Sequence, residues 1–273
     1  MDPFTGRVAV ITGGAGGIGM GLARAFAARG AKIVLADLDE AALARAATEL
    51  RGSGAAVHTV QTDVGDRAQV EALADAAFDR FGGAHVVCNN AGIALFGEMA
   101  QATHKDWEYT MRVNFWGVVH GVEAFVPRLI AQRAGGHVVN TASMAGLVGM
   151  QWLGIYCASK FAVVGLSEGL QRELAPHRIG VSVLCPMIVE TNINANSLRN
   201  RPTALRNPDH TDSPPDIEAG TMVGSVIKVE EVARRVVRAI DRGDFYILTH
   251  PEQREILRRR ARRQDQMFEP DTW

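Results

Sequence analysis

The 273-residue sequence lacks several features that would point to whole classes of protein. Its formal net charge is −1, from 29 basic and 30 acidic residues, so no global field draws the chain to nucleic acid or to a lipid surface. It has no uninterrupted apolar run of about 18 residues, which a membrane-spanning helix needs. The first ten residues carry an acid and no long apolar core, unlike a signal peptide. We therefore expect a soluble, cytoplasmic protein with no nucleic-acid or membrane partner.

Cysteine is also sparse. The three cysteines, Cys88, Cys157 and Cys185, are widely and irregularly spaced. No pair has the close spacing of a zinc or redox motif, so we expect buried free thiols in a reducing compartment and no metal site. What the chain does have is an ordinary globular balance of 47% apolar and 22% charged residues. Its length suffices to bury a large core without a disulfide or metal staple.

Short β-branched runs alternate with alanine-rich stretches along the chain. The runs lack strict alternation, as expected for parallel strands covered on both faces, and they span Val8–Ile11, Lys32–Ala36, Ala56–Gln61, His85–Cys88, His137–Thr141, Ile179–Leu184 and Phe245–Leu248. The helical stretches between them span Ile18–Arg29, Glu40–Leu50, Asp66–Phe81, Lys105–Gln132, Leu153–Ala175 and Glu230–Ile240. Right-handed strand–helix repetition builds a doubly wound parallel sheet. We predict an α/β Rossmann fold of about seven strands flanked by helices, in a single domain over residues 1–273.

Two stretches depart from this alternation. Residues 191–224 are polar, rich in Asn and Pro and without a strong period. Because usual loops have about 4–6 residues, this one is either functional or mobile, and we interpret it as a substrate loop. An Arg-rich tail occupies about residues 251–273. We interpret the tail as a solvated helix face, with subunit contact as the next alternative and nucleic-acid binding as a distant third.

A glycine-rich segment, TGGAGGIG, links the first strand to the first helix. Backbone N–H groups at a helix N-terminus bind anions, and glycines let a pyrophosphate approach them. Gly14, Gly16 and Gly19 satisfy the template G-x-G-x-x-G, whereas Gly13, Gly17 and Gly19 satisfy T-G-x-x-x-G-x-G. A tight turn would also explain these glycines, but their place between strand and helix indicates a dinucleotide site.

The end of the second strand indicates which nucleotide binds. Asp37 lies 18 residues beyond Gly19, where an acid can accept hydrogen bonds from the adenosine ribose and would repel a 2′-phosphate. Leu38 follows where a basic residue could bind that phosphate, and the glycine loop has no Lys or Arg. We therefore predict NAD rather than NADP. The alternative for Asp37 is a helix N-terminal acid, a part that Asp39 could play equally well.

The next two strands also end on polar side chains. A carboxylate at Asp63 could accept from the adenine amino group, or it could cap the helix that follows. Asn89 and Asn90 end the fourth strand and suit a turn. Ligands bind at the carboxyl edge of such sheets, so we place these ends beside the nucleotide.

A tyrosine and a lysine on one predicted helix indicate the chemistry. Tyr156 and Lys160 are four residues apart, so they lie on one face. A free phenol has a pKa of about 10, and bringing it to about 7–8 needs roughly 3–4 kcal/mol of preference for phenolate. The Lys160 ammonium and the charge of oxidised nicotinamide would both act in that direction. Tyr156 would then take the hydroxyl proton of an alcohol while hydride leaves its carbon, and would protonate the alkoxide in reverse.

The motifs TGGAGGIG, NNAG and YCASK, with Asp37, Asp63, Asn114 and Ser143, resemble the short-chain dehydrogenase/reductase family in its ordinary-length branch. The resemblance covers at least residues 5–191. It implies that Asn114, Ser143, Tyr156 and Lys160 are catalytic. It further implies an NAD site formed by Gly13, Gly17, Ile18, Gly19, Asp37, Asp63, Val64, Asn90, Tyr156, Lys160, Val189 and Thr191.

Several roles come from this resemblance. Ser143 would hold the substrate oxygen where charge develops. Asn114 would position water that links Lys160 to solvent, although a buried amide bridging backbone groups is an alternative that could hold as well. Val189 and Thr191 would hold the nicotinamide carboxamide. Met187 replaces the usual glycine there, which puts the loop geometry in doubt. The family also implies a homotetramer formed through its two longest helices, with a homodimer as the alternative.

The substrate is less well specified. Candidate pocket residues follow strand ends or flank the catalytic residues, namely Leu95, Phe96, Met144, Met150, Trp152, Met187 and Ile188. They suggest a hydrophobic, in part aromatic, secondary alcohol, with polar contacts available from Asn194, Asn196, Arg199 and Arg201 on the long loop. The loop and tail resemble bacterial dehydrogenases that act on benzylic alcohols of aryl ethers; steroids and terpenols are alternatives. We predict an NAD-dependent alcohol dehydrogenase. The competing hypothesis is a catalytically silent nucleotide-sensing or scaffold protein of the same fold.

Overall fold

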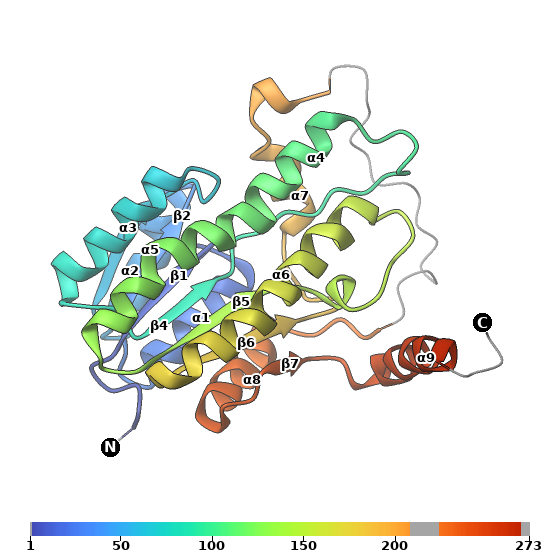
Figure 1. Ribbon diagram of the computed structural model, residues 1–273. Coiled ribbons are helices and arrows are strands. Elements are labelled where there is room, and N and C mark those ends of the chain that lie inside the picture. The colour runs from blue at the N-terminus through green and yellow to red at the C-terminus, as the bar shows by residue number, and fades with distance from the viewer. Residues whose placement is uncertain (1, 208–223, 269–273) are drawn as a thin grey trace.

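The computed structural model describes residues 2–207 and 224–268. Seven strands form one parallel sheet in the order β3-β2-β1-β4-β5-β6-β7 (Figure 1). They are β1 (Val8–Thr12), β2 (Lys32–Asp37), β3 (Val57–Gln61), β4 (Val86–Asn89), β5 (Gly136–Thr141), β6 (Ile179–Cys185) and β7 (Tyr246–Leu248). Each begins and ends within one residue of its predicted run. The doubly wound prediction is therefore confirmed.

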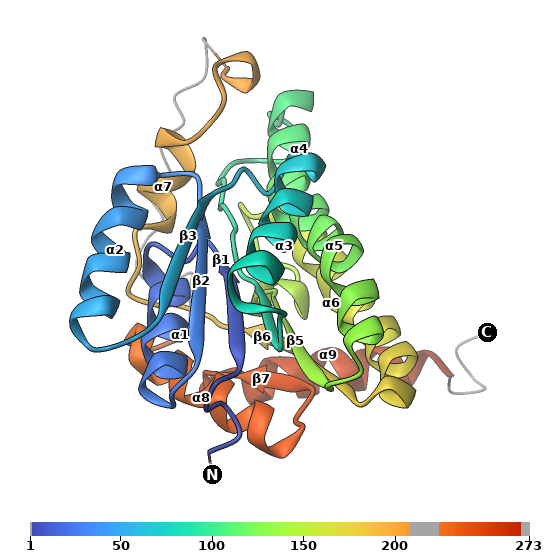
Figure 2. The same cartoon turned by 90° about the vertical axis from the view of Figure 1, so that its left-hand side faces the viewer.

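Helices cover both faces of the sheet (Figure 2). One face packs against α1 (Gly17–Ala28), α2 (Glu40–Gly52) and α8 (Val229–Arg242), whose apolar side chains form a core with alternate residues of the central strands. The other packs against α3 (Arg67–Phe81), α5 (Gly117–Gln132) and α6 (Gly154–Leu174). All five residues of β1 are buried. Two-sided coverage explains why the sequence shows apolar runs rather than alternation.

The predicted helix Lys105–Gln132 is wrong as one regular element. The structure divides it into α4 (His104–Met111), a π-helical segment η1 (Arg112–Trp116) and α5. A π-helix adds a residue to the turn and is frequent at functional sites. Asn114 lies in η1. The insertion therefore changes how side chains are presented at this point in the helix.

The chain after β6 provides one side of the sheet's carboxyl edge. The short helix α7 (Ile193–Arg199) begins in the predicted substrate loop, and a 3-10 turn, η4 (Thr203–Leu205), follows it. The rest of that loop, residues 208–223, and the last tail residues, 269–273, lie outside the described residues. The Arg-rich tail forms α9 (Arg254–Asp265), which has no buried residue and extends away from the sheet (Figure 1).

Within residues 2–207 and 224–268, no helix combines the length and the apolar character that crossing a bilayer requires.

Candidate active site

A cleft of about 1210 Å³ lies at the carboxyl ends of the strands. It runs from the glycine loop past Asp37 to Tyr156 and then to α7. Because all strands are parallel, their carboxyl ends meet at one edge, where ligands bind in such sheets. Of the predicted catalytic and cofactor-binding residues, only Gly19 and Asn114 do not line the cleft. The structure thus brings together segments that are far apart in the sequence.

The glycine loop has the backbone shape that only the longer-spaced template explains. Gly13 and Gly17 have φ angles of 62° and 48°, in the left-handed region, whereas Gly14 and Gly16 do not. A Cβ on Gly19 would lie 2.1 Å from the Gly13 carbonyl oxygen, while one on Gly16 would meet nothing within 4 Å. The left-handed and closest-packed positions are therefore those of T-G-x-x-x-G-x-G, although a Cβ on Gly14 would also lie too close, 2.8 Å from the Ile11 carbonyl oxygen. The loop leads straight into α1, so its backbone forms an open cradle that fits a pyrophosphate.

Asp37 faces this cradle. Its carboxylate accepts hydrogen bonds from the backbone N–H of Ala15 (3.1 Å) and of Asp39 (3.2 Å). The cap of α2 is Asp39, whose carboxylate accepts from the Ala42 N–H at 2.9 Å. Asp37 is therefore not a capping residue. It lines the cleft with Leu38 at the end of β2, where a ribose would lie.

The next segment of the cleft wall is held by side-chain contacts. Asp63 accepts from the Gly65 N–H at 2.8 Å and pairs with Arg112 at 2.7 Å, while the cap of α3 is Asp66. Val64 accepts from the ring of His120 through its carbonyl, at 2.8 Å. The sequence offered no signal for Arg112 as the partner of Asp63, because 49 residues separate them.

Asn90 links the strand that precedes the glycine loop to the strand that precedes Ser143. Its amide donates to the Thr12 carbonyl at 3.0 Å, and its carbonyl oxygen accepts from the Thr141 hydroxyl at 3.3 Å. Thr12 also accepts from the Asn90 backbone N–H at 2.9 Å. These bonds join the ends of β1, β4 and β5 and leave little freedom at the centre of the cleft.

Tyr156 and Lys160 share one face of α6, as predicted. Lys160 Nζ donates to the Thr141 carbonyl at 2.9 Å and lies 5.6 Å from the centre of the Tyr156 ring. Lys160 is 2% exposed, so a single carbonyl at the end of β5 orients an otherwise buried amine. Both side chains line the cleft.

The electrostatics of the pair differ from the expectation. Burial raises the pKa of Tyr156 to about 12, against a hydrogen bond with Ser143 that lowers it. Burial also lowers the pKa of Lys160 to about 8. Desolvation disfavours the charged form of each group, and in the chain alone it is the largest influence on the pKa of the Tyr156 phenol. The residues by themselves therefore do not produce a phenolate at neutral pH.

Ser143 follows β5 and caps the short turn η2 (Met144–Gly146), its hydroxyl oxygen accepting from the Ala145 N–H at 3.1 Å. The same hydroxyl donates to the Pro186 carbonyl at 3.3 Å. Ser143 therefore lies between Tyr156 and the loop that follows β6, and its oxygen is fixed from both directions.

Asn114 is fully buried and makes the backbone bridge that was one of its two interpretations. Its carbonyl oxygen accepts from the Ile93 N–H at 2.8 Å, and its amide donates to the Ile93 carbonyl at 3.0 Å and to Ser159 at 3.1 Å. A Cβ on Gly92 would lie 3.3 Å from Asn114 Oδ1 and 3.4 Å from Lys160 Nζ. Gly92 therefore lies close to both the Asn114 amide and the Lys160 amine.

The loop after β6 resolves the doubt about Met187. This residue does not have a positive φ, so it replaces glycine without backbone strain. Val189 pairs with Ile227 in an isolated parallel bridge, and Thr191 approaches the glycine loop so closely that a Cβ on Gly17 would lie 3.1 Å from its methyl group. Val189 and Thr191 thus close one side of the cleft.

The candidate pocket residues divide into two groups. Phe96, Met150, Met187 and Ile188 line the cleft, together with Asn194 and Asn196 of α7. Leu95, Met144, Trp152, Arg199 and Arg201 are not among the lining residues. Arg199 instead pairs with Asp39 at 3.4 Å. It joins α7 to the start of α2, beside the ribose end of the cleft.

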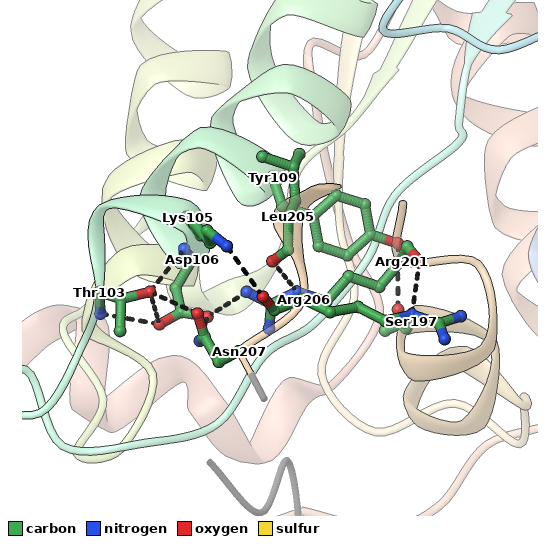
Figure 3. Close-up of polar contacts among 9 residues, drawn as sticks. All are labelled: Thr103, Lys105, Asp106, Tyr109, Ser197, Arg201, Leu205, Arg206 and Asn207. Carbon is green, nitrogen blue, oxygen red and sulfur yellow. Dashed lines mark hydrogen bonds and ion pairs between the residues drawn. The ribbon is translucent and has the colours of Figure 1, made fainter. Parts of the chain in front are cut away.

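Arg201 is a correction to the expectation of a substrate contact. Its side chain is 1% exposed and donates to Asp106 at 2.6 Å and to the Leu205 carbonyl at 2.7 Å (Figure 3). Burial acts to raise the pKa of Asp106, but hydrogen bonds from Thr103 and the Arg201 pair hold it below its usual range. The guanidinium also lies 5.8 Å from the Tyr109 ring centre. Arg201 therefore fastens the chain after α7 to α4.

Hydrogen bonds also hold α7 itself in place. The Tyr109 hydroxyl donates to the Ser197 carbonyl at 3.0 Å, and the Ser197 hydroxyl oxygen accepts from the Ala94 N–H at 2.9 Å (Figure 3 shows the tyrosine contact). Asn207 adds a bond to Asp106 at 2.9 Å. This wall of the cleft, which we call the substrate wall, is thus held by side chains of α4 and of residues 197–207, together with the backbone N–H of Ala94.

In the described part of the chain, no cluster of three or more His, Cys, Asp or Glu side chains is arranged to hold a metal ion.

Comparisons with known proteins agree with this geometry. Residues 7–202 match the family described as short chain dehydrogenase. Over 94% of its length the chain is 35% identical to a C alpha-dehydrogenase of Sphingobium sp., covering 85% of that protein. It is 37% identical to the 1-deoxy-11-beta-hydroxypentalenate dehydrogenase of Streptomyces exfoliatus, over 92% of this chain and 86% of that one.

A solved structure is similar over almost the whole chain. A short-chain dehydrogenase/reductase of Burkholderia phymatum, determined in complex with NAD, superposes with a TM-score of 0.92 at 42% identity, covering 99% of this chain and 98% of that chain. The glycine cradle and the cleft are therefore those of a nucleotide-dependent enzyme fold.

Proposed function

Because this chain belongs to the short-chain dehydrogenase/reductase family, we propose that it is an NAD-dependent alcohol dehydrogenase. It would interconvert a hydrophobic secondary alcohol and its ketone. The observation that carries the proposal is the convergence of Ser143, Tyr156 and Lys160 on the same cleft as the glycine cradle. Bound NAD supplies the hydride acceptor and a positive charge.

The contacts of each proposed catalytic side chain support a specific role in the reaction. Tyr156 takes the alcohol proton at its phenolic oxygen, or returns it in the reverse direction. The Ser143 hydroxyl, whose proton the Pro186 carbonyl accepts in the chain alone, turns to donate to the substrate oxygen where negative charge develops. Lys160 holds its place through Thr141 and stabilises the phenolate when protonated. Since burial is the main cause that raises the pKa of Tyr156 to about 12 in the chain alone, ionisation needs positive charge beyond that of the chain, and the rate of alcohol oxidation should rise with pH.

Asp37 supports NAD over NADP. Its carboxylate lies at the end of β2, bound to the backbone of the glycine loop, and a 2′-phosphate at this point would be repelled. Leu38, beside it, is 43% exposed and has no charge to offer. Val189, Thr191, Asn90 and Ile18 complete the proposed cofactor site with Val64 and with Asp63, whose carboxylate is proposed to meet the adenine amino group.

The pocket wall favours an apolar substrate. Phe96, Met150 and Met187 line it near Tyr156, and Asn194 and Asn196 offer amides on the α7 side. We propose a secondary alcohol with a large apolar or aromatic group, such as a benzylic alcohol of an aryl ether, a steroid or a terpenol.

The deciding experiment compares the native protein with Tyr156→Phe on a broad panel of alcohols. Native protein should reduce NAD, seen as NADH absorbance, and should prefer it to NADP. The variant should lose about 10³-fold or more in kcat, within the range of general acid–base catalysis. Its affinity for NADH should stay nearly unchanged. Turnover by the variant at the native rate contradicts the mechanism, and NADH binding without any turnover by native protein favours a nucleotide-sensing role.

The chain is also proposed to form a homotetramer. Trp116, at the start of α5, is 51% exposed, which suits burial of α5 and α6 against a second copy. Light scattering should give the mass of four chains; a monomer contradicts this assembly.

A further inference from the structure

A buried histidine beyond the catalytic residues lies behind the loop that follows β6. His250 comes two residues after β7 and is 3% exposed. Both ring nitrogens face backbone groups of segments distant in the sequence. The loop in question, residues 186–191, lines the cleft along its whole length.

The contacts of His250 assign its protonation. Nδ1 accepts from the Met187 N–H at 3.3 Å, and the Thr249 hydroxyl lies 2.6 Å from the same nitrogen. Nε2 lies 2.9 Å from the Ser225 carbonyl and 3.2 Å from the Ile188 carbonyl. An amide N–H can only donate and a carbonyl can only accept, so this ring is neutral with its proton on Nε2.

These contacts make His250 one end of a chain that reaches a proposed catalytic group. The Pro186 carbonyl accepts from the Ser143 hydroxyl at 3.3 Å and from the Met144 N–H at 2.8 Å. The next residue, Met187, is held by His250 on its amide side. The peptide between Pro186 and Met187 is thus bound from the catalytic side through its oxygen and from the far side through its nitrogen.

The same ring also aligns the loop with residues 225–227. Ile227 N–H donates to the Ile188 carbonyl at 3.1 Å, and Glu190 N–H donates to the Ile227 carbonyl at 3.0 Å. His250 Nε2 joins this short ladder through the carbonyls of Ser225 and Ile188. Val189 lies inside the ladder and Thr191 just beyond it, so the ring fixes the segment that presents both residues to the cleft.

We propose that His250 is a positioning residue for the nicotinamide end of the cofactor, acting through the Met187 amide. The proposal rests on the proposed function, in which Val189 and Thr191 hold that end. It predicts that replacing His250 weakens binding of the nicotinamide half of the dinucleotide. Binding of the adenosine half, which is proposed to lie at Asp37 and the glycine loop, should not change.

The test measures binding rather than turnover, with two probes. His250→Leu removes both polar contacts and should weaken NADH binding about tenfold, the order expected for loss of a buried hydrogen bond. Binding of ADP-ribose, which lacks the nicotinamide, should stay within about twofold. In the free protein, amide hydrogen exchange of a peptide spanning Met187 should be faster in the variant. His177→Leu, at an exposed histidine of the 3-10 turn η3 (Ala175–His177), is the matched control and should change none of these quantities.

Two further variants separate the two ring nitrogens. Asn carries an acceptor near the position of Nδ1, whereas Gln carries a donor near that of Nε2. His250→Asn should recover most of the NADH affinity and His250→Gln should not. Rescue by Gln alone would overturn the assignment to Met187, and equal weakening of NADH and ADP-ribose would show a role in general folding instead.

Failure of this inference is distinguishable from failure of the proposed function. If native protein binds NADH and oxidises an alcohol while His250→Leu binds NADH with native affinity, only the inference is wrong. If native protein neither binds NADH nor turns over an alcohol, the proposed function itself is wrong.

Discussion

The nucleotide side and the substrate side of the cleft are built in different ways. The nucleotide side is backbone: a glycine loop whose shape depends on positive φ at Gly13 and Gly17 and on close approach at Gly19. The substrate side is side chain: Arg201, Asp106, Tyr109 and Ser197 hold α7 against α4 (Figure 3). The nucleotide side therefore depends on positions without a side chain, whereas the substrate side depends on charged and polar side chains that contact one another.

The two designs differ in what they cost. The main cost of a glycine loop is entropic, because glycine loses more backbone freedom on folding than any other residue. A buried ion pair must offset the desolvation of two charges, and its net contribution to stability is small while it remains intact. Such a pair acts by fixing geometry. The substrate wall is preformed, because its fastening is complete in the chain alone: Arg201, Asp106 and Ser197 do not line the cleft, and Tyr109 does.

The largest expected effect is on the substrate side. Arg201→Met leaves the Asp106 carboxylate, whose side chain is 15% exposed, without its cation. Removal of one partner of a fully buried pair costs about 3–5 kcal/mol, so we expect a loss toward the lower end of that range. Chemical denaturation should show this loss in the free energy of unfolding. Arg199→Met, in the same region but at a 60% exposed side chain paired with Asp39, should change stability little, because exposed pairs contribute little. A similar loss of unfolding free energy in both variants would contradict the distinction between the buried and the exposed ion pair.

The next effect is on the nucleotide side. Gly19→Ala places a Cβ 2.1 Å from the Gly13 carbonyl oxygen, and overpacking of this kind costs about 1–3 kcal/mol, or roughly 10- to 100-fold in NADH affinity if the strain falls on the binding conformation. Isothermal calorimetry measures it. Gly16→Ala meets open space and is the matched control. Weaker binding in Gly16→Ala than in Gly19→Ala would favour the G-x-G-x-x-G template over the spacing that the structure supports.

The smallest effect concerns cofactor choice. Asp37→Ala removes the carboxylate proposed to repel a 2′-phosphate, and the ratio of kcat/KM for NAD over NADP should fall about tenfold, the order expected for a charged hydrogen bond. Steady-state kinetics with both cofactors measures the ratio. Glu40→Ala, at an exposed acid in the first turn of α2, is the control and should leave it unchanged. A native preference for NADP would contradict the role given to Asp37.

Much of the fold follows from local pattern. The apolar runs predicted all seven strands because burial on both faces leaves a signal in consecutive residues. The helix over residues 105–132 was mispredicted, since the π-helical turn around Asn114 depends on contacts with Ile93 and Ser159 that no local period records.

The placement of charged side chains was the weakest part of the prediction. Arg199 and Arg201 are near neighbours with the same chemistry, yet one pairs with Asp39 and the other is buried against Asp106. The pKa of Tyr156 in the chain alone could not be predicted either, because spacing along a helix predicts that a lysine is near but not how completely the pair is removed from water. Distance along a helix is local information, whereas desolvation is a property of everything packed around it.

By itself the sequence determined the parallel sheet, the glycine cradle and the shared face of Tyr156 and Lys160, since each depends on residues close together in the chain. Only the tertiary structure decided that Arg201 serves α4 rather than substrate and that His250 reaches the loop after β6. It also decided that burial opposes the charge on both Tyr156 and Lys160. These outcomes depend on which distant segments meet and how completely they exclude water. Neither can be predicted from residues that are close together in the chain.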